Sequence, residues 1–174
     1  MALPGALTLR GAVPADVPQI LEFIHELAEY ERLTHEVVAT EALLHDHLFG
    51  EHPAAEVVIG EWDGDPVAFA LFFHNFSTFL GQPGLYLEDL YVRPQMRGRG
   101  VGKAMLAHLA RLAVERGCGR FEWSVLDWNE SAIAFYGALG AEPMDGWTVQ
   151  RVTGDALARL GAHAPAGVGP GDAD

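Results

Sequence analysis

The chain has 174 residues, of which 49% are hydrophobic and 20% charged, and its formal net charge is −13. This composition is typical of a packed globular protein and excludes a mainly disordered chain. The acidic balance argues against nucleic acid or anionic membranes as partners and favours cationic ones. The length favours a single domain over residues 1–160, followed by a Gly-, Ala- and Pro-rich tail over 161–174 that we expect to be disordered.

Two absences narrow the setting in which the chain works. Cys118 is the single cysteine, so no internal disulfide is possible and nothing requires an oxidising compartment. The first residues lack the basic and apolar regions of a signal peptide, and no apolar run approaches the roughly 18 residues needed to cross a bilayer. We therefore expect a soluble, cytoplasmic protein.

The first half of the chain alternates short strand and helix patterns. Residues 7–13 have strand-like alternation, and the turn residues after them include Asp16, a candidate helix N-cap. The following helix has apolar residues at helical spacing, namely Val17, Ile20, Ile24, Leu27 and Ala28, with Glu22, Glu26 and Glu29 expected to face outward. Thr40 is expected to cap a second helix that ends near Gly50.

The second half continues with a predicted hairpin and two strand–helix units. Residues 57–59 and 67–73 flank Asp63-Gly64-Asp65, which is typical of a tight hairpin turn. Strands are then expected at 85–92, 121–126 and 147–152. Helices are expected from Arg99 to Gly117, from the cap Asn129 to Gly140, and at 155–160. The pattern predicts an α+β protein with a mixed sheet and helices on both faces.

The strongest functional signal is a glycine-rich turn between a predicted strand and a predicted helix. Its segment Arg97-Gly98-Arg99-Gly100-Val101-Gly102-Lys103 offers main-chain N–H groups at a helix start, which is a favourable place for a phosphate. A dinucleotide-binding G-x-G-x-x-G would need glycine at Lys103. A P-loop would need glycine at Arg97 and Ser or Thr at Ala104, so both motifs are excluded.

The pattern Arg-x-x-Gly-x-Gly, formed here by Arg97, Gly100 and Gly102, resembles the acetyl-CoA signature of the GNAT superfamily of N-acetyltransferases. The resemblance extends over about residues 7–160 and is closest to the spermidine/spermine N-acetyltransferases. It is carried by the segments at 26–31, 86–92, 127–130, 134–136 and 146–147. The segment at 125–129 is more similar to the paralogues that prefer thialysine and other lysine-like amines.

The resemblance implies the GNAT fold and a cofactor site. It implies a six- to seven-stranded mixed sheet whose fourth and fifth strands splay apart to admit the pantetheine of acetyl-CoA. By analogy, main-chain groups of the strand end and the turn hold the cofactor, together with residues of a later helix start. The implied cofactor-binding residues are Leu90, Tyr91, Val92, Arg97, Gly98, Arg99, Gly100, Val101, Gly102, Lys103, Asn129, Ser131 and Ala132. For Asn129, helix capping is a sufficient alternative reason.

The resemblance also implies the residues that act on the amine. Tyr136 matches the family's general acid, and Glu88 matches a position that contacts the amine and takes its proton. The further substrate-binding positions are Tyr30, Glu31, Glu122, Trp123 and Ser124. From strand alternation, Asp89 is expected on the opposite sheet face from Glu88 and on the same face as Leu87, where it could be a buried or dimer-facing carboxylate. Tyr136 could instead be a core aromatic on an apolar helix stripe.

The function implied is transfer of an acetyl group from acetyl-CoA to a primary amine of a small diamine, polyamine or lysine-like molecule by direct attack. The family analogy implies a homodimer, and we expect no metal, nucleic acid or membrane partner. Two alternatives stay open. The acceptor could be an amino acid, an aminoglycoside or a protein lysine, or the chain could be a non-catalytic acyl-CoA-binding module.

Overall fold

The computed structural model describes residues 6–165, which fall into two compact units divided between Leu126 and Asp127, each described here by itself. The first unit contains five strands and three α-helices. In chain order these are β1 (Leu7–Gly11), α1 (Val17–Glu31), α2 (Glu41–Phe49), β2 (Glu56–Trp62), β3 (Asp65–Ser77), β4 (Gln82–Val92), α3 (Val101–Glu115) and β5 (Arg120–Trp123). Single 3-10 turns lie at Pro14–Asp16, Thr34–Glu36 and Pro94–Met96.

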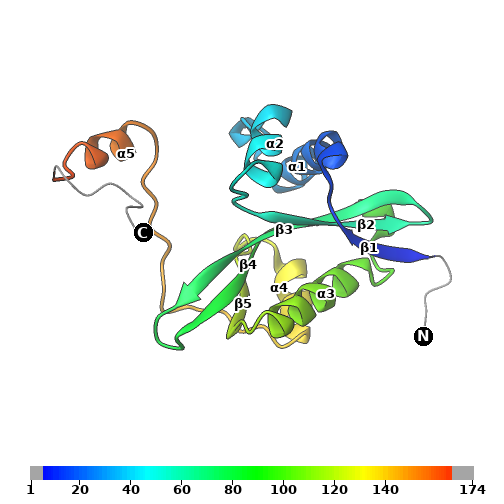
Figure 1. The fold of residues 1–174 in the computed structure, drawn as a ribbon. Coiled ribbons are helices and arrows are strands. Elements are labelled where there is room, and N and C mark those ends of the chain that lie inside the picture. Colours follow the sequence, from blue (N-terminus) through cyan, green and yellow to red (C-terminus); the bar gives the residue numbers. More distant parts are fainter. Residues whose placement is uncertain (1–5, 166–174) are drawn as a thin grey trace. The chain divides into compact units, whose positions relative to one another are not determined.

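The strands of the first unit form one mixed sheet in the order β1-β2-β3-β4-β5 (Figure 1). The first four strands are antiparallel neighbours, and β5 pairs parallel to β4. The β2–β3 hairpin is confirmed, and its turn residues Asp63 and Gly64 have φ of 53° and 90°. Positive φ at both central positions is the geometry of a type I′ turn, for which Asp-Gly is a preferred sequence.

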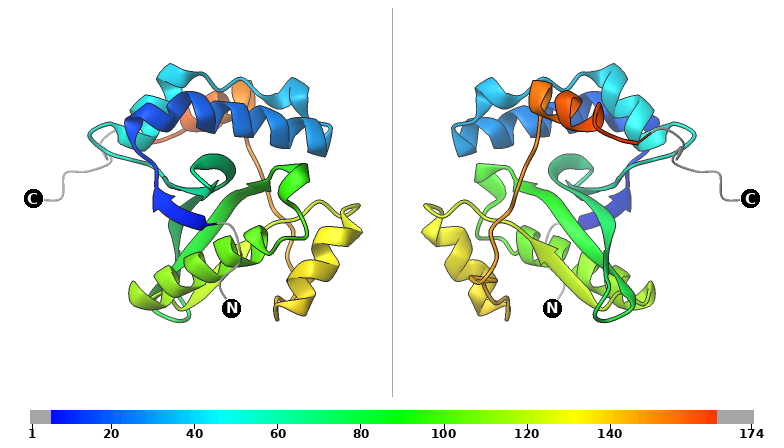
Figure 2. Two further views of the ribbon diagram at one scale, coloured as in Figure 1. Left: turned by 90° about the vertical axis from the view of Figure 1, so that its right-hand side faces the viewer. Right: turned by 90° about the vertical axis from the view of Figure 1, so that its left-hand side faces the viewer.

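Helices cover both faces of this sheet, as the sequence predicted. Figure 2 shows α1 and α2 on one face and α3 on the other. On the α1 face, the ring of Phe23 stacks on Phe69 at a centroid distance of 5.4 Å and lies 6.2 Å from Tyr91. On the other face, α3 contributes a buried stripe of Val101, Met105, Leu106, Leu109 and Ala113. These two apolar layers enclose the sheet, whose middle strand is β3.

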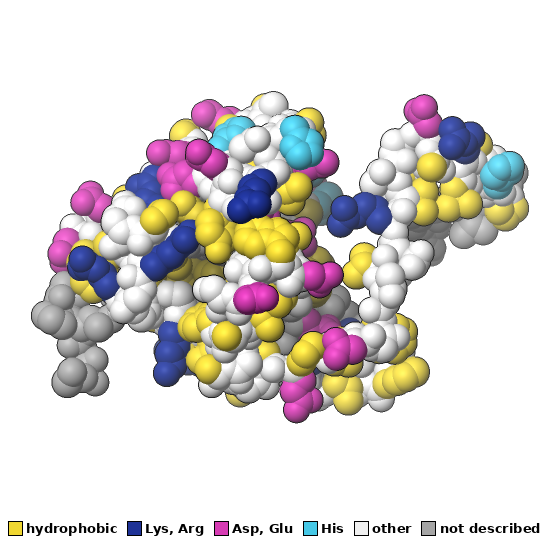
Figure 3. Space-filling view, turned by 180° about the vertical axis from the view of Figure 1, so that it is seen from behind, with side chains coloured by type: hydrophobic (Ala, Val, Ile, Leu, Met, Phe, Trp, Pro, Cys, Tyr) yellow, Lys and Arg dark blue, Asp and Glu magenta, His cyan; other side chains and the backbone are white. Residues whose placement is uncertain are grey.

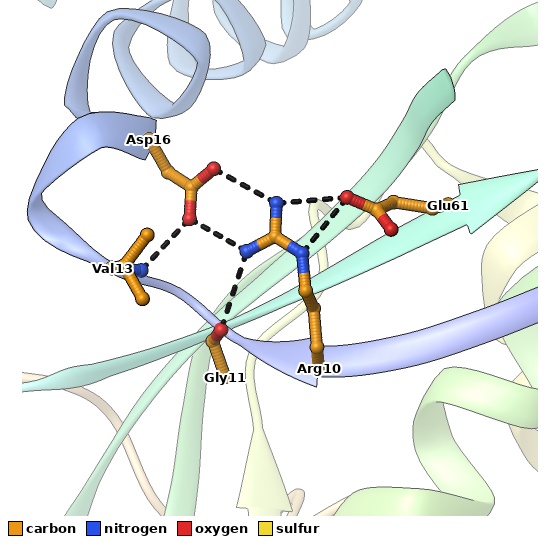
Figure 4. Close-up of polar contacts among 5 residues, drawn as sticks. All are labelled: Arg10, Gly11, Val13, Asp16 and Glu61. Carbon is orange, nitrogen blue, oxygen red and sulfur yellow. Dashed lines mark hydrogen bonds and ion pairs between the residues drawn. The ribbon is translucent and has the colours of Figure 1, made fainter. Parts of the chain in front are cut away.

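The start of α1 is fixed by a three-residue ion network rather than by the predicted cap. Asp16 precedes α1, but its carboxylate makes no capping bond to the helix. It accepts from the guanidinium of Arg10, at 2.7 and 2.9 Å, and from the N–H of Val13 (Figure 4). Arg10 also pairs with Glu61 at 2.8 Å. The hydrogen bond from Arg10 lowers the pKa of Asp16. Because Arg10 lies on β1, Glu61 on β2 and Asp16 directly before α1, the network links these three elements.

Three other expectations about helix residues meet different outcomes. Thr40 caps α2, since its hydroxyl accepts from the N–H of Leu43 at 3.2 Å. The buried face of α1 includes Phe23, which the spacing analysis did not select, while Ile24 is only partly buried. Glu26 does not simply face outward, because it pairs with Arg93 at 2.8 Å.

A β-bulge interrupts β4 at the point where the acidic residues lie. Leu71 pairs with Asp89 and Phe72 pairs with Leu87, so Glu88 is the extra residue of β4. Leu71 packs against the core under α1, whereas Phe72 lies under the guanidinium of Arg116 at the end of α3. Directly opposed residues share a sheet face. Asp89 is therefore on the α1 face and not on the face of Leu87, and the prediction that these two residues share a face is wrong.

The second unit contains two helices, α4 (Glu130–Ala138) and α5 (Gly154–Gly161). Asn129 caps α4 as predicted, accepting from the N–H of Ala132 at 3.3 Å. The strand predicted at 147–152 is wrong: this segment has no regular structure and pairs with no strand among residues 6–165. A ladder needs a partner, which local apolar alternation cannot supply. The sheet of the described residues thus has five strands rather than six or seven. Most of the predicted tail, residues 166–174, lies outside the described residues.

Candidate active site on β4 and the glycine-rich turn

The glycine-rich turn has the geometry expected of an anion-binding helix start. Gly98 and Gly100 have φ of 74° and 82°, which L-amino acids with a side chain rarely adopt. The first intrahelical bond of α3 runs from the N–H of Ala104 to the carbonyl of Gly100. The N–H groups of Val101, Gly102 and Lys103 therefore precede the helical ladder and point from the positive end of the helix dipole. A diphosphate fits this arrangement.

The strand that leads into the turn is paired differently on its two edges. β4 pairs with β3 along its whole length, up to Val92, but with β5 only from Gly84 to Leu87. The last five residues of β4, from Glu88 to Val92, thus have no ladder partner on the β5 side among the described residues. This is the splayed geometry expected of the fourth and fifth strands. The edge includes Leu90, Tyr91 and Val92, the residues whose main chain was expected to hold the pantetheine.

Three carboxylates gather beside this edge. Glu31 at the end of α1 is half-buried, and burial raises its pKa. Asp89 is also half-buried. Burial first, and then the charges of Glu88 and Glu31, raise the pKa of Asp89 to about 6. A cation beside the three carboxylates would be favoured, because one positive group would relieve the repulsion that helps to raise the pKa of Asp89. Sequence reasoning found Glu31 and Glu88 but assigned Asp89 to the wrong face.

The side chains of Arg97 and Tyr30 are in contact where the glycine-rich turn begins. The guanidinium of Arg97 lies 4.6 Å from the ring centroid of Tyr30 and 5.8 Å from that of Tyr91. Its Nε donates to the carbonyl of Val92 at 3.1 Å. The side chain of Arg97 is thus directed at α1 and at the end of β4, whereas sequence reasoning placed it with the cofactor.

Arg93 and Glu26 form a second contact that sequence reasoning missed. Arg93 donates to the Glu26 carboxylate through Nε at 3.1 Å and Nη2 at 2.8 Å, and to the Pro66 carbonyl through Nη1 at 3.1 Å. Burial and a hydrogen bond to Glu26 raise the pKa of Tyr91. No local motif marks this cluster, because its members come from α1, the β2–β3 hairpin and β4.

The remaining basic residues of the turn lie on the surface. Arg99 is exposed, with its guanidinium 5.8 Å from the ring centroid of Trp62, and Lys103 is exposed in the first turn of α3. Acidic and histidine side chains gather at the α1–α2 end of the first unit (Figure 3). The first unit therefore combines basic side chains at the turn with an acidic helical end.

The expected substrate residues on β5 are partly engaged in local contacts. Glu122 binds Nε of Arg120 at 2.7 Å and accepts from Nδ2 of Asn75 at 3.3 Å. The ring of Trp123 lies 4.9 Å from that of Phe121. Ser124 follows β5, and its hydroxyl is 2.9 Å from that of Tyr86.

The other expected site residues belong to the second unit. Tyr136 is half-buried on α4, with its ring 5.5 Å from that of Phe135. Ser131 is exposed and Ala132 half-buried in the first turn of α4, and the N–H of Ala132 is bonded to Asn129.

Residues 6–165 contain neither a metal-ligand cluster nor a membrane-spanning helix. In this part of the chain no group of three or more His, Cys, Asp or Glu side chains is arranged to hold a metal ion. No helix there is both long and apolar enough to cross a membrane.

The fold and the glycine-rich turn define an acyltransferase class, and comparison with known families gives the same result. The model of the Acetyltransferase (GNAT) family matches residues 19–141. This chain belongs to the GNAT family.

Curated relatives place it among the N-acetyltransferases. A Thialysine N-epsilon-acetyltransferase of Mus musculus is 38% identical over 163 residues, covering 87% of this chain and 95% of the relative. An L-ornithine N5-acetyltransferase of Arabidopsis thaliana is 36% identical over 194 residues, covering 86% of this chain and 85% of the relative. With the family match, these relatives identify the chain as an N-acetyltransferase.

Solved structures confirm the fold. An integron cassette protein from the mobile metagenome of V. cholerae superposes with a TM-score of 0.75 at 25% identity, covering 94% of this chain and 99% of that one. An aminoglycoside acetyltransferase from a soil metagenome superposes with a TM-score of 0.70 at 15% identity, covering 85% and 95% of the two chains.

Proposed function

We propose that the protein transfers an acetyl group from acetyl-CoA to a primary amine of a small diamine, polyamine or lysine-like substrate. One observation carries the proposal: the same strand, β4, bears Glu88 and Asp89 at its bulge and leads through a single 3-10 turn into the glycine-rich turn. An amine held at the carboxylates would therefore lie along the strand edge to which a diphosphate-anchored thioester is aimed. The curated relatives that act on thialysine and ornithine support the choice of amine.

The turn accepts the cofactor through its main chain. Acetyl-CoA supplies the thioester, and the N–H groups at the start of α3 would bind its diphosphate. At Gly98 a Cβ would meet no atom within 4 Å, so the surface there is open, and its φ of 74° lets the backbone turn toward an anion. Main-chain groups of Leu90, Tyr91 and Val92 would bind the pantetheine, and the family resemblance assigns Asn129, Ser131 and Ala132 to the cofactor as well.

The carboxylates and Tyr136 would handle the two protons of the reaction. The free amine is the nucleophile, so the protonated substrate must first lose a proton, to Glu88 directly or through water. The nitrogen then bonds to the acetyl carbon as the carbon–sulfur bond breaks, and the Tyr136 hydroxyl protonates the leaving thiolate. The tyrosinate takes back the second proton, which the nitrogen loses as the amide forms. Tyr30, Glu31, Glu122, Trp123 and Ser124 would bind the rest of the amine. The rate should rise with pH until Tyr136 ionises.

An acceptor panel with a thiol-release assay tests this proposal. Purified protein is given acetyl-CoA and, in turn, thialysine, lysine, ornithine, putrescine, spermidine, an aminoglycoside and a lysine peptide. We expect the highest kcat/KM on one of the first five. If the aminoglycoside or the peptide were turned over faster than these five amines, the proposed acceptor class would be wrong. Tight coenzyme A binding with no turnover of any amine would indicate a non-catalytic module. The homodimer that the resemblance implies and a cytoplasmic location are both part of the proposal, and analytical ultracentrifugation tests the dimer.

A further inference from the structure

Helix α1 and the loop between β4 and α3 are joined by two side-chain contacts. Glu26 and Tyr30 are four residues apart on α1, so they lie one turn apart on the same face of the helix. Arg93 and Arg97 are also four residues apart and flank the 3-10 turn Pro94–Met96. Glu26 contacts Arg93, and Tyr30 contacts Arg97. We call these two contacts, Glu26–Arg93 and Tyr30–Arg97, the two rungs. They join α1, which carries the expected amine-binding residue Tyr30, to the loop that leads into the glycine-rich turn.

The Glu26–Arg93 rung fixes the position of α1. Besides its bonds to Glu26 and to the Pro66 carbonyl, the guanidinium of Arg93 lies 4.9 Å from the centroid of the buried Phe23 ring. Hydrogen bonds, charge and a ring contact thus hold α1 against the end of β4 one turn before Tyr30. A substitution at Tyr30 therefore changes the second rung while the helix stays anchored.

The Tyr30–Arg97 rung is the one that reaches the cofactor side. Arg97 is exposed, yet it is held by the Tyr30 ring on one side and by the Val92 carbonyl on the other. Arg97 is followed directly by Gly98, the first left-handed glycine of the turn. A guanidinium kept in place by a ring therefore fixes the backbone where the anion-binding turn begins.

We propose that Tyr30 is a positioning residue for the cofactor: by stacking on Arg97 it holds the start of the glycine-rich turn in its anion-binding shape. The proposal rests on the proposed function and adds a coupling between its two halves. A residue assigned to the amine pocket contributes to coenzyme A affinity without contacting coenzyme A. Loss of the stack loosens Arg97, and the turn must then be ordered by the ligand itself.

Calorimetry with coenzyme A tests the coupling in a double-mutant cycle of Tyr30→Leu and Arg97→Gln. We expect Tyr30→Leu to weaken coenzyme A binding by about two- to fivefold, the range of an exposed cation–π contact. Tyr30→Phe, which keeps the ring, should bind as the wild type does. The double variant should bind no more weakly than Arg97→Gln alone. Glu29→Gln, an exposed neighbour on α1, is the matched control and should leave the affinity unchanged. Unchanged affinity in Tyr30→Leu, or additive losses in the double variant, would overturn the proposal.

A second measurement separates this proposal from the proposed function. The Nε–H of Arg97 gives a side-chain signal in a ¹H–¹⁵N spectrum, and a proton above a tyrosine ring is shifted upfield. That shift should be present without ligand, lost in Tyr30→Leu and kept in Tyr30→Phe. If the wild type shows no heat with coenzyme A, the proposed function fails while this spectrum still tests the stack. A signal that does not move in Tyr30→Leu refutes the stack itself.

Discussion

Replacing Asp89 by asparagine should make the protein more stable at neutral pH, although it removes a residue of the candidate site. Asp89 is half-buried on the α1 face, near Glu31 and the bulge residue Glu88. Burial and these charges raise its pKa from 3.8 to about 6. Its ionised form is therefore about 3 kcal/mol less favourable in the folded protein than in the unfolded chain.

The sign of the pH dependence follows from where the proton is held. Between about pH 4 and pH 6 the folded protein keeps the Asp89 proton while the unfolded chain releases it, so stability falls as the pH rises through this range. The destabilisation should be about 2 kcal/mol at pH 5.5 and about 3 kcal/mol at pH 8. Asparagine cannot ionise. The stability of Asp89→Asn relative to wild type should therefore rise by about 1 kcal/mol between these two pH values.

Urea unfolding followed by circular dichroism at pH 5.5, 6.5 and 8 measures this difference. Asp65→Asn, at the exposed start of β3, removes one negative charge elsewhere and reports the effect of net charge alone. We expect Asp89→Asn to gain about 1–3 kcal/mol at pH 8, because the amide must still be accommodated in the same site. A variant less stable than wild type at pH 8, or a gain that is the same at all three pH values, would refute the reasoning.

Three further predictions concern the turn, the ion network and the general acid. Gly100→Ala places a side chain at a residue whose φ is 82°, so the variant should lose about 1 kcal/mol of stability. Its coenzyme A affinity, measured by calorimetry, should fall at least roughly tenfold. The control Gly11→Ala on β1 should lose no affinity. Asp16→Asn should lose about 1 kcal/mol at pH 7 in urea unfolding. Because the folded-state pKa of Asp16 is lowered, its contribution to folding stability is complete above about pH 4 and is lost on acidification. Equal stability of the variant and the wild type at pH 7 would contradict this prediction. Tyr136→Phe should lower kcat about 100-fold or more and leave coenzyme A affinity unchanged; wild-type kcat would exclude it as the acid.

Local sequence signals predicted the elements whose structure is decided within a few residues. The Asp63-Gly64 turn, the Thr40 cap and the Asn129 cap are all confirmed, since each depends on backbone geometry and one short side chain. The strand at 147–152 was predicted from the same kind of signal and is wrong. A strand also needs a partner, and alternation does not say whether one is available.

The candidate site was predicted unevenly for a similar reason. The glycine-rich turn is contiguous, so its residues could be selected from spacing alone. Glu31 and Glu88 were found only through a family resemblance. Asp89 was assigned to the wrong face because a β-bulge is a property of a strand pair, which a single strand's sequence does not reveal. The Arg93–Glu26 pair was missed because 67 residues separate its members.

The sequence by itself determined that the chain is an acidic globular protein with a glycine-rich turn at a helix start, because glycines at fixed offsets restrict what the backbone can do locally. Tertiary structure alone decided which carboxylates share a face, which arginines hold α1, and that Asp89 resists ionisation. These properties depend on packing between segments far apart in the chain. Burial and charge at a site are sums over neighbours, and neighbours exist only once the sheet has formed.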